Sequence, residues 1–246
     1  MENEGMEKLL FELASENRLG ILRELQRGSL KMQEIARRLN VTATEAFRQL
    51  ERLSTASLIQ RQPDGAFTIA EYGKLVLQLT SSLEFVFKHK EYFSTHDIML
   101  LPSQFVNRIG ELSQAKLVTD TIESINTGER MFLEAKQYTW GIAEGVVPEL
   151  MGPAMNEQLQ RGVKGKFLIP EDRLFASINP ALADMFEARG IPDLPAIVAL
   201  TEKEAAICFR LIGGKMDYAG FYGKEPIFIG WVKDLFLYYW DKGKHP

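Results

Sequence analysis

Apolar residues recur at helical spacing along most of the N-terminal part of the chain, and two short segments alternate instead. Leu9 and Leu13 belong to the first series, in which Ser15 and Asn17 favour a break because their side chains compete with helical backbone bonds. Gly28 is expected to end this helix, since glycine is common just past a helix. The pattern predicts helices at residues 6–25, 31–39, 42–56 and 71–93, and short strands at residues 58–61 and 66–69.

The second and third predicted helices are joined by a tight turn at Asn40. Ala36 is small and lets the next helix cross closely. Thr42 can cap the third helix, with Glu45 three residues on as its capping-box partner. The two short strands then flank a Pro63-Asp64-Gly65 turn, in which Pro fixes φ and Gly can adopt a positive φ. Helix, turn, helix and hairpin is the order of a winged helix-turn-helix.

The exposed side of the third helix and the hairpin carry side chains suited to DNA. In helix-turn-helix proteins the second helix of the motif faces base edges, where Arg can pair with guanine and Gln with adenine. The hairpin would offer its side chains to phosphates or the minor groove. The predicted DNA-binding residues are Arg37, Arg38, Thr42, Thr44, Glu45, Arg48, Gln49, Arg52, Arg61 and Gln62. The alternative is that Arg48, Gln49 and Arg52 form only a solvated face.

The predicted helix at residues 71–93 is rich in apolar residues for a lone surface helix. It either packs on the C-terminal part or pairs with its mate in a dimer, and winged-helix regulators commonly bind two half-sites as symmetric pairs. We expect a homodimer. The predicted organisation is a winged helix-turn-helix domain at residues 1–72, a linker or dimerisation helix at residues 73–100 and an α/β sensor domain at residues 101–246.

Helical and strand patterns alternate through the C-terminal part. Helices are predicted at residues 101–112, 120–135, 147–160, 179–189 and 226–240, and strands at residues 115–118, 138–143, 163–169, 196–200, 205–211 and 216–221. In the helix at residues 120–135, Ile122, Ile125, Met131 and Phe132 are expected to face inward, with an interruption near Gly128. The alternation predicts a mixed α/β layer with partly parallel strands.

The C-terminal part contains several aromatic residues, some with a polar group at the end of the ring. Such side chains are typical of a pocket for a small molecule. We expect them to lie near strand ends, with lysines and an arginine facing an anionic ligand. The predicted ligand-binding residues are Tyr138, Trp140, Lys164, Lys166, Arg210, Tyr218, Tyr222 and Trp231. The alternative is that these aromatic side chains only fill the core.

The composition narrows the class of protein. The chain has 246 residues and a formal net charge of −4, so any DNA-binding face must be local. Its single cysteine, Cys208, excludes an internal disulfide framework and favours a reducing cytoplasm. No apolar run is long enough to span a membrane, and the acidic N-terminus does not resemble a signal peptide.

Catalytic and metal signatures are missing from the sequence. It has no phosphate-binding Walker loop and no Gly-x-Ser-x-Gly elbow, and it has only three histidines. His96 beside Asp97 lacks a second cluster of metal ligands, and Cys208 within an apolar segment reads as an inert thiol. We therefore expect no catalytic residues, no metal site and no cofactor, and we expect the protein not to be an enzyme.

Two segments resemble known families. The stretch ENRLGILREL…MQEIARRLNVTATEAFRQLERLSTASLIQR…GAFTIAEYGKLV resembles the ArsR-type winged-helix domain of archaeal transcription regulators. The metal-sensing members use Cys and His ligands, and this region has no Cys, so metal sensing is not implied. The stretch YTWGIAEGVVPEL…LQRGVKGKFLIP resembles the sensor domains of FilR-type methanogen regulators and one half of the phospholipase D-like fold.

The phospholipase D resemblance implies a fold and a binding role. The catalytic signature of those enzymes is a His, a Lys two residues on and a downstream Asp, and the Val163-Lys164-Gly165-Lys166 segment has no His beside it. The sequence as a whole predicts a cytoplasmic, dimeric transcription regulator that binds double-stranded operator DNA, an inverted repeat, under control of a small-molecule effector. Two alternatives stay open: a winged-helix module that binds proteins, and an enzyme of the nucleotide or phosphodiester class.

Overall fold

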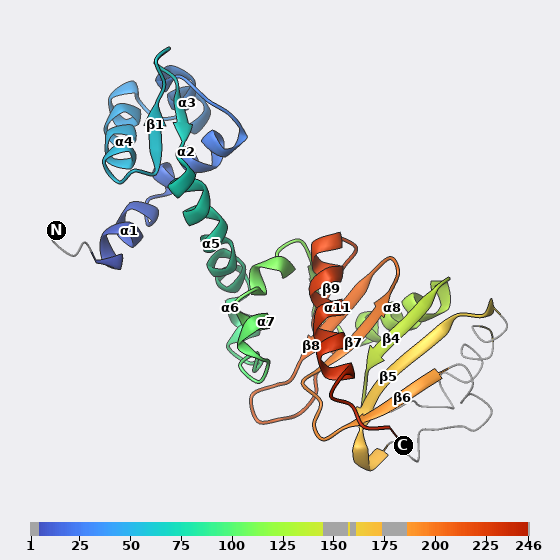
Figure 1. The fold of residues 1–246 in the computed structure, drawn as a ribbon. Helices are drawn as coiled ribbons and strands as arrows, with labels where there is room; N and C mark the ends of the chain where they lie inside the picture. Colours follow the sequence, from blue (N-terminus) through green and yellow to red (C-terminus); the bar gives the residue numbers. More distant parts are fainter. Residues whose placement is uncertain (1–4, 145–156, 158–160, 174–185, 246) are drawn as a thin grey trace. The chain divides into compact units, whose positions relative to one another are not determined.

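The computed structural model describes residues 5–144, 157, 161–173 and 186–245 (Figure 1). The chain divides into two compact units, Met1–Ser81 and Ser82–Pro246. The predicted helix at residues 147–160, apart from Glu157, and most of the one at residues 179–189 lie outside the described residues. Among the described residues, no helix combines the length and apolar character needed to cross a membrane.

The N-terminal unit is a winged helix-turn-helix preceded by one further helix. Its elements are α1 (Met6–Leu13), α2 (Glu16–Arg27), α3 (Met32–Leu39), α4 (Ala43–Thr55), β1 (Ile59–Arg61), β2 (Phe67–Ile69) and the first part of α5 (Glu71–Lys88). The predicted break in the first helix is confirmed, because the Ser15 hydroxyl caps α2 by accepting a hydrogen bond from the Arg18 backbone N–H. The apolar sides of α2, α3 and α4 meet in a core that contains Ile21, Ile35 and Leu50.

Local backbone chemistry sets the turn and the wing. Asn40 adopts the left-handed conformation, with φ 54° and ψ 43°, and so ends α3 sharply. Gly65 has a φ of +82° in the turn between β1 and β2, as predicted. Leu30 pairs with Phe67 through two backbone hydrogen bonds of 3.0 and 2.8 Å, which adds a third strand segment to the hairpin.

The C-terminal unit is a mixed sheet with helices on both faces (Figure 1). Besides the end of α5, its elements are α6 (Lys90–Phe93), α7 (Ser103–Val106), η1 (Ile109–Leu112), β3 (Lys116–Val118), α8 (Thr121–Glu134), β4 (Tyr138–Ile142), β5 (Lys164–Pro170), β6 (Phe186–Ile191), β7 (Ala196–Thr201), β8 (Ala205–Phe209), β9 (Gly220–Gly223) and α11 (Pro226–Trp240). The strand order is β3-β9-β8-β7-β4-β5-β6. The β4-β5 and β5-β6 pairs are parallel and the other pairs antiparallel, so the predicted mixed α/β class is confirmed.

The two faces of this sheet are filled differently. Ala196, Val198 and Leu200 of β7 are buried on the side of the sheet that faces α11. Trp231 of α11 is also completely buried in this core. On the face toward α8, Ile197 and Ala199 of β7 are only partly buried. The main hydrophobic core of the unit therefore lies on the α11 side.

Several predicted elements differ from the observed ones. Phe186–Ile191 is a strand and not the end of a helix, because its backbone pairs in parallel with β5. The helix predicted at residues 71–93 divides at His89 into α5 and α6. Helix α8 continues through Gly128, where an interruption was expected. Ile122 and Ile125 do not face inward but are 69% and 50% exposed, since α8 buries mainly Met131 and Phe132.

Candidate functional site

Helix α4 presents one face to the core of the N-terminal unit and the opposite face to solvent. Ala46, Leu50 and Leu53 are buried. Thr44 and Arg48, which are exposed, lie on the other side of the helix by their spacing. The Thr42 hydroxyl accepts a hydrogen bond from the Glu45 N–H at 3.2 Å, so it caps α4 as predicted. The first two turns of α4 therefore offer short polar side chains and one arginine to a partner.

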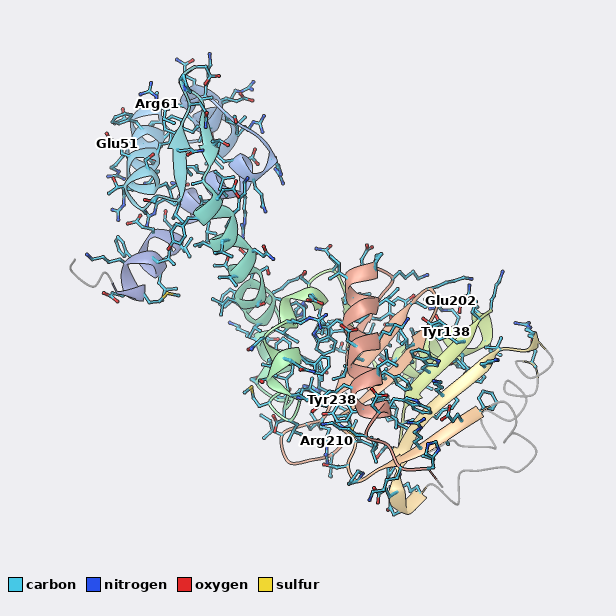
Figure 2. All side chains as sticks on the ribbon, viewed as in Figure 1. Glu51, Arg61, Tyr138, Glu202, Arg210 and Tyr238 are labelled. Atoms are coloured by element: carbon cyan, nitrogen blue, oxygen red, sulfur yellow. The ribbon has the colours of Figure 1, made fainter. Side chains whose placement is uncertain are left out.

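Three arginines lie around the exposed face of α4 without a carboxylate partner among the described residues. Arg37 on α3, Arg48 on α4 and Arg61 on β1 are exposed and make no ion pair with any residue that the structure describes. Arg61 lies over the Phe67 ring at 5.9 Å and projects from the wing (Figure 2). Arg38 differs, because it donates hydrogen bonds of 2.7 Å to both Glu24 and Glu34. Any anion would have to displace those carboxylates from Arg38.

Gln49 does not point to a base edge, which corrects the sequence-based expectation. Its side chain is 6% exposed and its Oε1 accepts a hydrogen bond of 3.0 Å from Arg18 Nη1. The same guanidinium donates to the backbone carbonyls of Glu12 at 2.7 Å and Phe11 at 2.6 Å. Gln49 thus belongs to a buried network that joins α4, α2 and the end of α1.

Arg52 is also engaged within the protein. It donates to the Glu12 carboxylate at 2.5 and 3.1 Å and lies 5.0 Å over the Phe11 ring. These hydrogen bonds hold the pKa of the Glu12 carboxyl below its usual range. Glu45 accepts a 2.7 Å hydrogen bond from the Asn17 side chain. Arg52 and Glu45 therefore position α1 and α2 against α4, and no local sequence signal marks partners so far away in the chain.

Of the wing residues, Gln62 contributes through its backbone. Its N–H donates to the Ala66 carbonyl at 2.7 Å and closes the turn. Asp64 at the tip accepts a 3.0 Å hydrogen bond from the Ala66 N–H, which places one carboxylate in the turn of the wing. Glu51 projects from the exposed side of α4 (Figure 2). These two acidic groups limit how closely phosphates can approach the tip of the wing and the second half of α4.

We expect replacement of Gln49 by Ala to lower stability and leave base recognition intact. The change removes the acceptor for a buried Arg18 N–H, which costs about 1–3 kcal/mol of unfolding free energy. The measurement is denaturant unfolding of the full chain. Gln60→Ala, at an exposed position on β1, is the matched control and should change stability by less than about 0.5 kcal/mol. An unchanged stability with an altered preferred DNA sequence would restore Gln49 as a base reader.

Four of the predicted ligand-binding residues gather on the α11 side of the sheet. Tyr138 pairs in register with Lys164, and Trp140 with Lys166. The Trp140 ring stacks on Phe236 at 5.1 Å, and Lys166 Nζ lies 5.5 Å from its centroid. Burial, with the nearby Glu202 carboxylate, raises the pKa of Tyr138, and Figure 2 shows Tyr138 and Glu202 near each other. The faces of these rings are largely covered by the protein's own side chains.

The other four predicted residues lie in separate places. Trp231 fills the core within α11 and donates a 3.3 Å hydrogen bond to the Phe105 carbonyl, which corrects its expected position near a strand end. The Tyr222 hydroxyl bonds to Glu204, which is paired with Arg130. The structure therefore does not bring the eight predicted residues into one site.

Arg210 and Tyr218 complete this set. Arg210 Nη1 donates to Asp193 at 2.6 Å and its Nη2 to the Gly214 carbonyl at 2.8 Å, so it holds the turn after β8.

Tyr218 lines a cavity of about 350 Å³ between α8 and the sheet, and Trp140 is the other predicted residue in that lining. This cavity lies on the opposite side of the sheet from α11.

The side chains of His96 and Cys208 are engaged within the protein. His96 is buried, stacks on Tyr92 at 3.7 Å and contacts Asp217 Oδ2 at 3.1 Å through Nε2. Burial raises the pKa of the Cys208 thiol to about 12. Within the part of the chain that the structure describes, no group of three or more His, Cys, Asp or Glu side chains is placed to hold a metal ion.

The class of protein that the fold defines is a winged helix-turn-helix joined to a mixed α/β unit. Among solved structures the chain is similar to TrmBL2, described as an archaeal chromatin protein with a novel mode of DNA binding, at 16% identity over 92% of both chains with a TM-score of 0.45. It is also similar to Nuc, a phospholipase D family member from Salmonella typhimurium, at 14% identity over 50% of this chain and 90% of that one, with a TM-score of 0.40.

A third similar structure is NucT from Helicobacter pylori, at 10% identity over 54% of this chain and 97% of that one, with a TM-score of 0.42. No protein-family model matches the sequence, and no curated protein matches it. Identities this low concern the fold alone. The ArsR-type and FilR-type resemblances of the two segments stay predictions.

Proposed function

We propose that this protein is a DNA-binding transcription regulator whose winged helix binds duplex DNA. The observation that carries the proposal is the exposed first half of α4, where Arg48 stands without an ion-pair partner among the described residues. Arg37 and Arg61 flank it from α3 and the wing, at the places that reach phosphates in this motif. Thr44 and Arg48 are the proposed base readers, and Arg37 and Arg61 are the proposed phosphate contacts.

The distribution of charge supports a local DNA-binding face. The whole chain has a net charge of −4, but residues 31–61 contain six Lys and Arg against three Glu. This excess is modest, so non-specific attraction to DNA should be weak and the specific contacts should matter more. Arg38 contributes less than its position suggests, because Glu24 and Glu34 already neutralise it.

We also propose that the protein acts as a homodimer through α5. Five side chains at spacings of three and four residues, which we name the α5 stripe, are between 38% and 67% exposed: Tyr72, Leu75, Leu79, Leu83 and Val86. Such spacing places them along one side of the helix. A second copy that presents the same stripe would cover them and would give the twofold symmetry that an inverted repeat requires.

For the C-terminal unit we propose a sensing and non-enzymatic role. The segment that resembles phospholipase D enzymes carries Lys164 and Lys166 without an adjacent His. Lys166 lies over Trp140 and Trp240, at 5.5 and 4.9 Å, where it packs on the rings. An effector bound in this unit would change operator affinity by favouring one arrangement of the dimer.

The experiment that tests DNA binding is selection of random duplexes by the purified full chain, followed by binding to the selected sequence over a series of salt concentrations. We expect an enriched inverted repeat with half-sites about one helical turn apart. The logarithm of the association constant should fall linearly with the logarithm of salt concentration, with a slope that reports the phosphates contacted. No enrichment together with a flat salt response would reject the proposal and favour a protein-binding winged helix.

A further inference from the structure

The cavity beside α8 is built by a row of small residues across the sheet. Gly141 pairs in register with Phe167 on one side and with Ala199 on the other, and Ala199 pairs with Ala206. Register partners in adjacent strands point to the same face. One glycine and two alanines on neighbouring strands thus form a flat floor, with the Phe167 ring at its edge, and all four residues line the cavity.

Helix α8 covers this floor and leaves space beneath it. Ile125, Gly128 and Phe132 are among the residues of α8 that line the cavity. A Cβ atom added at Gly128 would meet no atom within 4 Å. Glycine within a helix costs about 1 kcal/mol relative to alanine, so its presence here lowers the stability of α8 without a steric reason. The resulting volume is about 350 Å³, within the range of small-molecule sites.

The part of the lining that the structure describes is largely apolar and carries no basic group. Of the described residues around the cavity, none is a Lys, Arg or His, and Glu129 is the one acidic residue. The hydroxyl-bearing side chains in the lining are Ser124, Thr139, Thr201 and Tyr218. The Cys208 thiol stays protonated at neutral pH because its pKa is about 12. An anion would find no opposite charge there, whereas a neutral apolar molecule would find matching surface and a few hydrogen-bonding groups.

We propose that this cavity binds a neutral, largely apolar molecule with one or two flat rings, held between α8 and the row Phe167, Gly141, Ala199 and Ala206. That such a ligand acts as the effector rests on the proposed function. The assignment departs from the anionic ligand expected from the sequence, because Lys164 and Lys166 lie on the other face of the sheet and Arg210 is paired with Asp193.

The test is a fluorescence titration of the full chain with phenylnaphthylamine, a neutral probe with two flat aromatic groups, naphthyl and phenyl, compared with its charged relative anilinonaphthalene sulfonate. We expect saturable binding of the neutral probe at one site per chain and weaker binding of the sulfonate. Gly128→Leu places a side chain in the cavity and should weaken binding by about tenfold or more. Leucine favours helix over glycine, so this variant should melt no lower than the unchanged protein.

The matched control is Asn126→Leu, which adds the same side chain to α8 at an exposed position outside the lining. It should bind the neutral probe as the unchanged protein does. A second filling variant, Ala199→Leu, approaches the cavity from the floor and should lose binding as Gly128→Leu does. Absence of saturable binding, equal affinity in Gly128→Leu and Asn126→Leu, or preference for the sulfonate would each overturn the proposal.

This experiment contains no DNA, so its outcome is independent of the proposed function. Operator binding is then measured with and without the neutral probe, in the unchanged protein and in Gly128→Leu. An effect of the probe on the unchanged protein alone supports an effector role for the cavity. If the protein binds the probe but no DNA, the proposed ligand site is supported and the proposed regulatory function is rejected.

Discussion

Replacing Arg48 by Ala is expected to weaken binding to the selected operator by about 1–3 kcal/mol, the range found for a bidentate contact to a base. The loss should be larger for the preferred sequence than for random duplex, because Arg48 is proposed to read a base on the exposed side of α4. The measurement is a binding titration against the operator and against duplexes mutated at single positions. At the position that Arg48 reads, the variant should no longer distinguish the bases.

Arg27→Ala is the charge-matched control for this change. Arg27 is exposed at the end of α2, where it is paired with Glu24, so the variant loses one positive charge outside the proposed recognition face. Its effect on operator binding should be small and equal for all sequences. Equal, sequence-independent losses in both variants would show that Arg48 acts only through its charge, and no loss in Arg48→Ala would remove it from the interface.

Charged substitutions in the α5 stripe are expected to convert a dimer into a monomer. Leu79 and Leu83 are 67% and 61% exposed, so glutamate at both positions costs little within one chain but would be buried and repelled at a twofold interface. The oligomeric state is measured by analytical ultracentrifugation. Affinity for an inverted repeat should fall by about a hundredfold, because the second half-site no longer benefits from the first.

Gln78→Glu provides the control on the same helix. This residue is exposed and lies outside the α5 stripe, so the added charge should leave both the oligomeric state and the affinity unchanged. Gln78→Glu should keep the unfolding midpoint of the unchanged protein, whereas the double variant should lose the part of the stability that dimerisation supplies. A Leu79→Glu, Leu83→Glu variant that sediments as the unchanged protein does would exclude α5 as the dimer interface.

Sequence reasoning succeeded where the cause of the structure is local. Asn40 ends α3 in the left-handed conformation and Gly65 adopts its positive φ. Both effects follow from the residue itself and its immediate neighbours. Strand β7, predicted at residues 196–200, also follows from its own short run of apolar residues.

Sequence reasoning failed where the cause is distant in the chain. Gln49 and Arg52 read as solvent-facing residues of α4, but α1 and α2 supply their partners Glu12 and Arg18 from more than thirty residues away. Strand β6 forms because β5 offers it a parallel neighbour. The floor of the cavity needs the register of four strands at once, so the small residues Gly141, Ala199 and Ala206 do not stand out singly.

Helix α5 has a consequence for how the chain can be cut or recombined. Val76 and Leu77 are buried in the core of the N-terminal unit, whereas Phe85, further along the same helix, is buried in the core of the C-terminal unit. A fragment that stops at residue 72, the boundary expected from the sequence, would leave the first core without two of its members. A fragment of the winged helix-turn-helix unit that folds alone must extend beyond Leu77, and exchange of the two units between proteins must transplant this helix whole.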